Sequence, residues 1–182
     1  MQLKRVVITG LGMVTSLGND VTTTWHNLLL GKSGAEEITH FDATKFKTHF
    51  ACEVKNLDMS SLLDIKELRR YDRYLHYAIK SAEEAIQDAN IKIEQEDLLR
   101  CGVIYGSGMG GVNTLDVNIG NFGASDGTPR YSPFFIPMII TNMAAGLLAI
   151  RYGFKGVNFA TTSACSSSAH AIANACYQIR MG

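Results

Sequence analysis

This sequence lacks four features that would each indicate a class of protein: an excess of charge of one sign, an apolar run of membrane-spanning length, closely spaced cysteines, and a cluster of histidines. Lysine plus arginine equals aspartate plus glutamate at 17 each, so net charge points to no nucleic acid and no membrane surface as a partner. No repeat or low-complexity tract is visible. With 182 residues, 46% of them hydrophobic and 19% charged, the composition fits a soluble globular domain with a sizeable core.

The longest apolar stretch, FFIPMIITNMAAGLLAI at 134–150, is short for a membrane span and is interrupted by Pro137, Thr141 and Asn142. We interpret it as a buried helix. The amino terminus, MQLKRVVITGLG, has no apolar run long enough for a signal peptide. Free thiols in a chain without an export signal favour the reducing cytosol, so we expect a cytoplasmic protein.

The four cysteines could serve metal binding or catalysis. They contain no C-x-x-C pair, and no group of histidines has metal-binding spacing, so we predict no metal site. The positions are Cys52, Cys101, Cys165 and Cys176.

Hydrophobic periodicity predicts alternating strands and helices. Three short strands are expected, at 3–9, 101–105 and 156–162. Four helices are expected, at 21–29, 71–89, about 137–151, and from 165 onward. Residues 32–56 have no clear period, and a glycine- and aspartate-containing loop is expected before the third helix. Strands separated by long helical stretches indicate an α/β layered fold.

Cys165 lies in an unusual run of small residues, ATTSACSSSAHAIANA at 160–175. A strand should end near Thr162 and a helix should begin near Cys165, which places the thiol at a helix amino terminus. Unpaired N–H groups and the helix dipole there stabilise an anion, such as a thiolate, by roughly 0.3–1 kcal/mol. The same N–H groups can hold the oxyanion formed when a thioester carbonyl is attacked. The pattern therefore fits an acyl-accepting nucleophile.

Most free cysteines are small buried hydrophobes, and position alone leaves both interpretations of Cys165 open. Cys52, Cys101 and Cys176 fit the buried-hydrophobe interpretation better, because Cys101 opens a strand and Cys176 shares the apolar face of the last helix. His170 follows Cys165 by well over one helical turn, so their side chains should diverge. We interpret His170 as a polar contact.

The stretch GSGMGG matches the dinucleotide-binding pattern G-x-G-x-x-G at Gly106, Gly108 and Gly111. In a dinucleotide site the ribose-binding acid ends a second strand. Asp126 has the right distance in sequence but lies in NFGASDGTPR, which is typical of a turn. Close backbone approach, or room for an extended acyl chain beside the thiol, would also explain the glycines. The hypothesis of a dinucleotide-dependent oxidoreductase would rest on this stretch alone, so we predict no cofactor.

Five stretches resemble the β-ketoacyl-[acyl-carrier-protein] synthases of the thiolase superfamily, most closely the elongating type II synthases. They are RVVITGLGMVTSLGN (5–19), LLLGKSG (28–34), GVIYGSGMGG (102–111), YSPFFIPMIITNMAAGLLAIRYGFKG (131–156) and TTSACSSSAHAIANACYQIRMG (161–182). Val157 departs from the family, which commonly has proline there, and this affects only a loop. The resemblance implies a thiolase-like layered α-β-α fold with a mixed sheet and a buried helix.

The resemblance also implies roles for single residues. Cys165 stands in the SAC stretch, where the family has its acylated nucleophile. Gly108 and Met109 would line the acyl pocket. Phe135 and Met138 would reach the pocket or the interface of a partner subunit, since the family is dimeric.

A basic segment, LLDIKELRRYDRYLHY at 62–77, contains Lys66, Arg69 and Arg70. Such charges are usually solvated surface. The family docks its acidic acyl carrier protein on basic residues of this segment, and opposite charges steer such an encounter. We therefore expect these three residues to form a docking surface for acyl carrier protein.

The resemblance implies a decarboxylative Claisen condensation in fatty-acid chain elongation, with Cys165 carrying the acyl group. Family members are well over twice this length, and their two active-site histidines and lysine lie in the second half. We therefore expect residues 1–182 to be the amino-terminal part of a ketosynthase domain, and to be poorly soluble and inactive in condensation alone.

Two alternatives to a fatty-acid enzyme stay open. One is a ketosynthase of a type II polyketide or aryl-polyene system. The other is a non-catalytic partner that resembles a chain-length factor, although such partners usually replace the nucleophilic cysteine, which is present here as Cys165.

Overall fold

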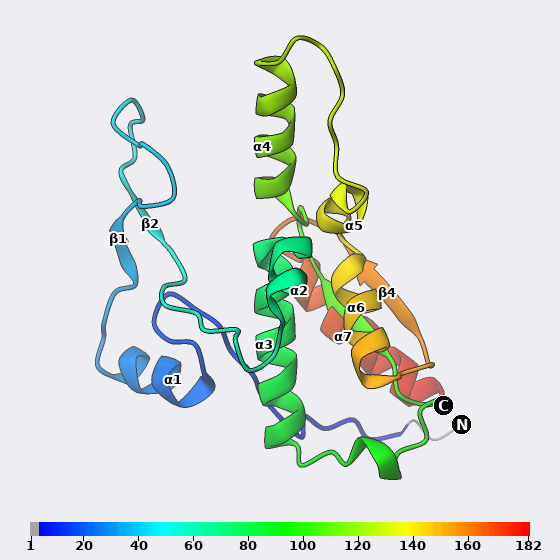
Figure 1. Ribbon diagram of the computed structural model, residues 1–182. Coiled ribbons are helices and arrows are strands. Elements are labelled where there is room, and N and C mark those ends of the chain that lie inside the picture. The colour runs from blue at the N-terminus through cyan, green and yellow to red at the C-terminus, as the bar shows by residue number, and fades with distance from the viewer. Residues whose placement is uncertain (1–3) are drawn as a thin grey trace. The chain divides into compact units, whose positions relative to one another are not determined.

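The computed structural model describes residues 4–182, which divide into two compact units (Figure 1). The first unit comprises the residues up to Ile8, Leu63–Ile79 and Ile91–Gly182. It holds α2 (Ile65–Arg70), the first part of α3 (Arg73–Asp88), η1 (Ile93–Gln95), β3 (Val103–Gly106), α4 (Val112–Gly123), α5 (Phe135–Ile139), α6 (Met143–Tyr152), β4 (Asn158–Thr161) and α7 (Ser167–Met181). The second unit holds α1 (Val21–Leu29), β1 (Ala35–Glu37), β2 (Phe50–Cys52) and the end of α3.

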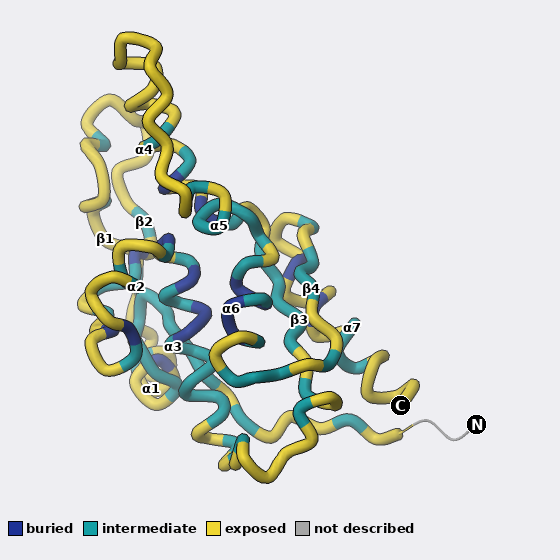
Figure 2. Tube along the Cα trace, turned by 45° about the vertical axis from the view of Figure 1, so that its right-hand side comes forward, coloured by how far each residue is buried: buried dark blue, intermediate teal, exposed yellow. Residues whose placement is uncertain are grey.

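The sheet of the first unit is the parallel pair β3–β4, in which Gly106 lies opposite Thr161. Helices α6 and α7 both contact these strands. Asn158 ties β4 to α6, because its side-chain amide donates to the carbonyl of Ala145 at 2.9 Å. The buried residues of α6 are visible in Figure 2 and are Ala144, Ala145, Leu147 and Leu148. The predicted α/β class is thus confirmed, and the prediction of a buried helix is confirmed for α6 but not for α5, which has no buried residue.

Helix α3 confirms the prediction made from the three- and four-residue spacing at 71–89. Its residues Leu75, Ala78 and Ile79 are at most 1% exposed. The chain leaves the helix through Asn90, whose φ of 52° lies in the left-handed region that asparagine tolerates better than most residues.

The second unit contains α1, whose first turn is capped by Asp20. The carboxylate of Asp20 accepts from the Thr23 N–H at 2.6 Å. Three large apolar residues of this predicted helix, Trp25, Leu28 and Leu29, are more than half exposed. Their periodic face is therefore not buried within the described part of the chain.

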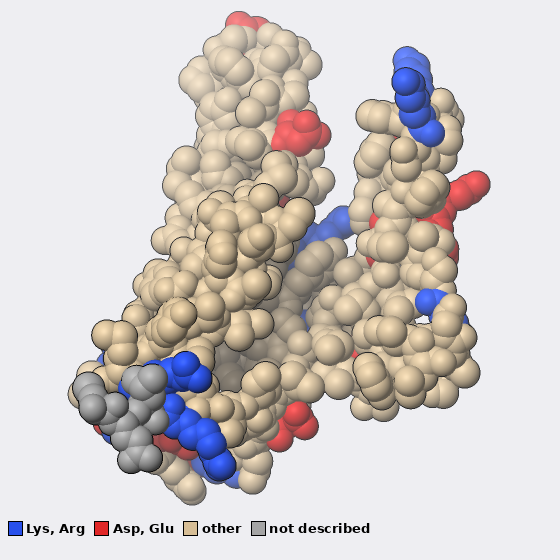
Figure 3. All heavy atoms as spheres, turned by 180° about the vertical axis from the view of Figure 1, so that it is seen from behind, with Lys and Arg blue, Asp and Glu red and all other residues tan. Residues whose placement is uncertain are grey.

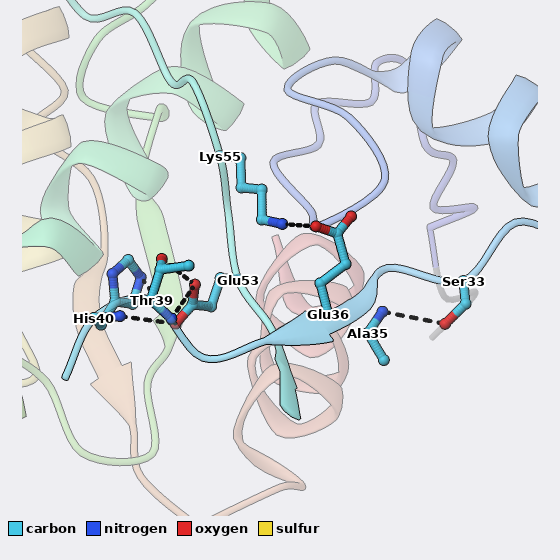
Figure 4. A network of polar contacts seen from close by, with 7 residues as sticks. All are labelled: Ser33, Ala35, Glu36, Thr39, His40, Glu53 and Lys55. Atoms are coloured by element: carbon cyan, nitrogen blue, oxygen red, sulfur yellow. Dashed lines mark hydrogen bonds and ion pairs between the residues drawn. The ribbon is translucent and has the colours of Figure 1, made fainter. Parts of the chain in front are cut away.

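An antiparallel hairpin, β1–β2, lies in the segment where no period was found. Figure 4 shows the side chains that hold it: the Glu53 carboxylate accepts from the backbone N–H and hydroxyl of Thr39 and from the His40 N–H, and Lys55 pairs with Glu36. Hydrogen bonding from Thr39 holds the pKa of Glu53 below its ordinary value. Polar contacts rather than an apolar face therefore fix this pair of strands.

The strand predicted at 3–9 is wrong for residues 4–9, and its first residue lies outside the described residues. A strand needs a neighbouring backbone to bond with, and no backbone in the described part of the chain pairs with this segment. The side chain of Ile8 is accordingly 79% exposed. Further along, the backbone N–H groups of Leu11 and Met13 donate to Asp88 and Glu84 of α3 at 2.9 Å.

One predicted loop and two predicted helices also differ from the structure. Helix α4 forms where a loop was expected. The helix expected at about 137–151 is divided into α5 and α6, because Ile140 has an extended backbone and its carbonyl accepts from the Tyr74 hydroxyl. Helix α7 begins at Ser167, so the thiol of Cys165 precedes the helix by two residues instead of starting it.

On the face drawn in Figure 3, most of the surface belongs to residues other than lysine, arginine, aspartate and glutamate. This agrees with the 19% of charged residues in the sequence. No helix within residues 4–182 combines the length and the apolar character that crossing a membrane requires.

Candidate active site

The predicted nucleophile follows β4, and the glycine run follows β3. Because parallel strands end at the same edge of a sheet, the segments after Gly106 and Thr161 leave the sheet side by side. The Ser107 N–H donates to the Thr161 carbonyl at 3.1 Å, which continues the pairing beyond β3. This edge therefore joins two stretches that lie far apart in the sequence.

Cys165 lies in a tight turn between β4 and α7. The preceding residue, Ala164, has a φ of 49°, in the region that residues other than glycine seldom adopt. The hydroxyl of Ser167 holds the turn, because it donates to the Ala164 carbonyl at 2.7 Å and accepts from the Ser163 N–H at 2.9 Å. Ser167 is buried and Cys165 is exposed, so a buried anchor holds the thiol at the surface.

His170 also belongs to this turn. Its Nδ1 lies 2.6 Å from the Ser163 hydroxyl oxygen, and the residue is exposed. The interpretation of His170 as a polar contact is confirmed.

The glycine run packs between this turn and α5. A Cβ atom at Gly106 would lie 2.6 Å from the backbone of α7, and one at Gly108 would lie 3.5 Å from the Ala164 carbonyl oxygen. On the other side, a Cβ atom at Gly111 would overlap the Met138 carbonyl. Close backbone approach thus requires glycine at Gly106 and Gly111. Of the predicted acyl-site residues, Gly108 consequently lies in this loop beside the Cys165 turn, and Met138 lies against the other end of the loop at Gly111.

The other two predicted acyl-site residues are placed differently. Met109, at the tip of the glycine run, is 72% exposed. Phe135, in the first turn of α5, is half-buried, and its ring centroid lies 5.0 Å from that of Tyr131. Their contact with an acyl chain stays a prediction.

The predicted docking residues lie on α2, a short helix capped by Asp64. Lys66, Arg69 and Arg70 are all exposed. Arg70 has a further contact, because its guanidinium carbon lies 4.6 Å from the centroid of the Phe134 ring, a cation–π geometry. The three basic residues are therefore not equivalent.

The other three cysteines lie in three different environments. Burial raises the pKa of Cys101, which disfavours its thiolate. The expectation of a buried Cys52 is wrong, because β2 lies in an exposed hairpin and Cys52 is exposed with it. Cys176 is half-buried on α7.

Sequence reasoning missed a buried carboxylate beside the glycine run. Asp72 is 5% exposed, and its Oδ2 accepts from the backbone N–H and the hydroxyl of Thr114 at 3.0 and 2.5 Å. Aspartate before a helix is a recognisable capping signal for α3, but nothing in the sequence indicates a bond to a residue of α4. Burial also raises the pKa of Tyr74 and lowers that of His76, which favours the uncharged form of each.

The geometry of the described residues favours neither a metal site nor a dinucleotide site. Within residues 4–182, no three histidine, cysteine, aspartate or glutamate side chains are grouped so that they could hold a metal ion. Asp126 accepts from the Thr128 N–H at 3.0 Å in the loop after α4, which is the turn that the sequence predicts. A cavity of about 430 Å³ in the first unit is lined by neither Cys165 nor a predicted acyl-site residue.

Comparison with known proteins gives one family and close relatives. The family model described as "Beta-ketoacyl synthase, N-terminal domain" matches residues 3–182. The 3-oxoacyl-[acyl-carrier-protein] synthase 2 of Coxiella burnetii (strain RSA 493 / Nine Mile phase I) is 42% identical over 179 residues, which cover 98% of this chain and 43% of that protein. The protein of the same name from Staphylococcus aureus (strain COL) is 42% identical over 181 residues, which cover 100% and 44%. The chain thus spans less than half the length of these curated relatives.

A solved structure supports the fold. A β-ketoacyl synthase from Burkholderia phymatum STM815 superposes with a TM-score of 0.81 at 28% identity, over 100% of this chain and 44% of that one. The expected thiolase-like α/β architecture is confirmed.

Proposed function

Because this chain belongs to the β-ketoacyl synthase family, whose amino-terminal domain its residues 3–182 match, we propose that the whole protein is an elongating 3-oxoacyl-[acyl-carrier-protein] synthase of fatty-acid synthesis. The relatives that are 42% identical carry that activity in their names. The observation that carries the proposal is the exposed thiol of Cys165 in a strained turn between β4 and α7.

Cys165 serves as the acyl acceptor in this proposal. Its thiolate attacks the thioester carbonyl of an acyl-carrier protein, the carrier thiol leaves, and the acyl group becomes a thioester of Cys165. Malonyl-carrier protein then loses carbon dioxide, and the resulting carbanion attacks the acyl-cysteine carbonyl and displaces the cysteine thiolate. The product is a β-ketoacyl-carrier protein that is longer by the two-carbon unit.

The local geometry supports this chemistry in two ways. Helix α7 begins two residues after the thiol, and the dipole at its amino terminus favours negative charge on the carbonyl oxygen under attack. Ser167 and the small residues around it hold the turn without covering Cys165. By resemblance to the family, the histidines that assist decarboxylation would come from sequence beyond residue 182.

The acyl chain would run along the glycine run toward α5. Gly108 lies against the turn of Cys165, and Met138 lies on the far side of the same run. Met109 and Phe135 flank this path, and Phe135 with Met138 would also reach the subunit interface of a homodimer. The support for this acyl path is the resemblance to the family.

Acyl carrier protein is the proposed partner, and α2 is its proposed docking surface. Lys66 and Arg69 are exposed on this helix and can meet acidic groups of the carrier. Arg70 lies at the same helix end but is already in contact with Phe134. Lys66 and Arg69 should therefore contribute more to docking than Arg70. A cytoplasmic location follows from the same function.

The proposal is tested with the complete open reading frame that contains this chain. Acyl- and malonyl-carrier proteins are supplied, and the β-ketoacyl product is measured by mass spectrometry. The wild-type protein should form product that depends on malonyl-carrier protein, and Cys165→Ala should form none. Activity that persists in Cys165→Ala at the wild-type rate would refute the assignment of the nucleophile.

A further inference from the structure

Asp72 caps two helices at once. Its Oδ1 accepts from the Tyr74 N–H in the first turn of α3 at 3.2 Å, and its Oδ2 accepts from the N–H and hydroxyl of Thr114, the third residue of α4. The residue before α4 is Gly111, which has no side chain to cap the helix. Asp72 thus supplies, from a remote position in the sequence, the cap that the sequence of α4 lacks.

The residues on either side of Asp72 contact the two ends of α5. The guanidinium of Arg70 stacks on Phe134, which immediately precedes α5. The hydroxyl of Tyr74 donates to the carbonyl of Ile140, which immediately follows α5, at 2.6 Å. Three alternate residues at the junction between α2 and α3 therefore contact three helix ends. Arg70 contacts the start of α5, Asp72 the start of α4, and Tyr74 the end of α5. We call Arg70, Asp72 and Tyr74 the junction clamp.

The junction clamp lies directly against the glycine run. A Cβ atom at Gly111 would lie 3.1 Å from the Cβ of Asp72 and would overlap the Met138 carbonyl. With so little space, the glycine run cannot move independently of Asp72 or of α5. The position of the proposed acyl path between Gly108 and Met138 is thus tied to the cap that Asp72 provides.

We propose that Asp72 is a positioning residue for acyl-chain binding, which acts through Thr114 to hold the glycine run and α5 at the correct separation. The proposal rests on the proposed function. It predicts an effect that depends on acyl length, because only a long chain would extend past the glycine run to α5. A cap that merely stabilised the fold would affect short and long chains alike.

Thr114 gives the sharpest test, because it can be changed without touching the carboxylate. Thr114→Val removes the hydroxyl that donates to Asp72 and keeps the side-chain shape, whereas Thr114→Ser keeps the hydroxyl. Thr24→Val is the matched control. Thr24 is 3% exposed, and its hydroxyl bonds to the Gly18 carbonyl and to Thr15, so the same substitution removes a buried hydroxyl outside the clamp.

The experiment measures kcat/KM of the complete protein with butyryl- and dodecanoyl-carrier protein, alongside the melting temperature of each variant. Thr114→Val should lower the dodecanoyl-to-butyryl ratio of kcat/KM by roughly three- to tenfold, the range that one buried hydrogen bond corresponds to. Thr114→Ser should restore the ratio. Thr24→Val should lower the melting temperature but leave the ratio unchanged.

Equal ratios in Thr114→Val, Thr24→Val and wild type would overturn the proposal and leave Asp72 a structural cap. If Thr114→Val does not fold, Tyr74→Phe decides, because it removes only the hydroxyl that holds Ile140. A lower ratio in Tyr74→Phe supports the clamp, and an unchanged ratio refutes it. A wild-type protein without condensation activity would instead refute the proposed function.

Discussion

The two small sheets of this chain are held by different forces. The site sheet, β3–β4, packs against α6 and α7, and its last residue, Gly106, meets the backbone of α7 without room for a side chain. The hairpin, β1–β2, is exposed along all of β1 and at both ends of β2. Its neighbouring polar side chains, such as Glu53 on Thr39, take the place of a packed face.

This difference indicates where chemistry can be placed. A nucleophile needs a fixed position, and close backbone packing on rigid elements provides it. Cys165 follows the site sheet, whereas Cys52 lies on the hairpin, and both thiols are exposed. The stability of the site sheet should therefore be sensitive to changes in side-chain size. The stability of the hairpin should be sensitive to changes in charge and hydrogen bonding.

The largest expected effect is the loss of folding stability when one methyl group is added beside each sheet. Gly106→Ala pushes a Cβ atom into the backbone of α7 and should lower the free energy of unfolding by about 1–3 kcal/mol. Gly34→Ala, just before β1, meets the hydroxyl oxygen and the Cβ of Ser16; the hydroxyl can rotate away, and a small shift of the loop relieves the Cβ contact, so it should cost less than moving the backbone of α7. Urea denaturation of both variants measures the two costs. Equal losses would contradict the distinction between the sheets.

The two exposed thiols should also react at different rates. Limiting iodoacetamide should label Cys165 several times faster than Cys52, because Cys165 is the proposed nucleophile, exposed on a fixed turn before α7, whereas Cys52 lies on the hairpin. Cys101, whose pKa is raised by burial, should lag behind both. Peptide mapping after a short exposure of the folded protein gives the order. Preferential labelling of Cys52 would remove the argument for a special thiol.

Charge reversal should separate α2 from the hairpin. The double variant Lys66→Glu and Arg69→Glu should raise the KM for acyl carrier protein several-fold at low salt, and the effect should shrink as salt screens the charges over about 10 Å at 0.1 M. The control is Lys45→Glu with Lys47→Glu, which makes the same charge change at exposed lysines between β1 and β2. An equal rise in KM for the control would show a general charge effect instead of a docking surface.

The smallest expected effect concerns Glu53, whose pKa is lowered chiefly by the Thr39 hydroxyl. Since the folded pKa is lowered, its contribution to stability is present above the unfolded pKa and is lost as the pH falls through the folded value. Thr39→Val should bring the pKa up toward the usual value of about 4.3. Carboxyl carbon shifts measure it by NMR, with Asp42, whose pKa is lowered by Thr44, as an internal reference. An unchanged pKa of Glu53 would refute the role of Thr39.

Much of the fold near the site could be predicted from local sequence. The three- and four-residue spacing of apolar residues specifies α3, because that face is buried in the structure. The turn between strand and helix at Cys165 could be predicted from the change from an apolar strand to small residues. The predicted start of the helix, near residue 165, is two residues too early, because α7 begins at Ser167.

What could not be predicted depends on partners that are distant in sequence. Helix α4, VNTLDVNIGNFG, contains glycines and asparagines that disfavour a helix, and its cap is supplied by Asp72 from another element. The interruption between α5 and α6 likewise depends on the Tyr74 hydroxyl. The charge pattern alone does not distinguish Arg70, which contacts Phe134, from Lys66 and Arg69.

The most direct test of the account is to locate the acyl group on the protein. The complete protein is incubated with acyl-carrier protein without malonyl-carrier protein and digested, and tandem mass spectrometry locates the acyl group on individual cysteines, since Cys165 and Cys176 fall in one tryptic peptide. The account predicts the mass of the acyl group on Cys165, its absence in Cys165→Ala, and its retention in the matched variant Cys176→Ala. An acyl group on Cys52, Cys101 or Cys176 in the wild-type protein, with Cys165 unmodified, would contradict it.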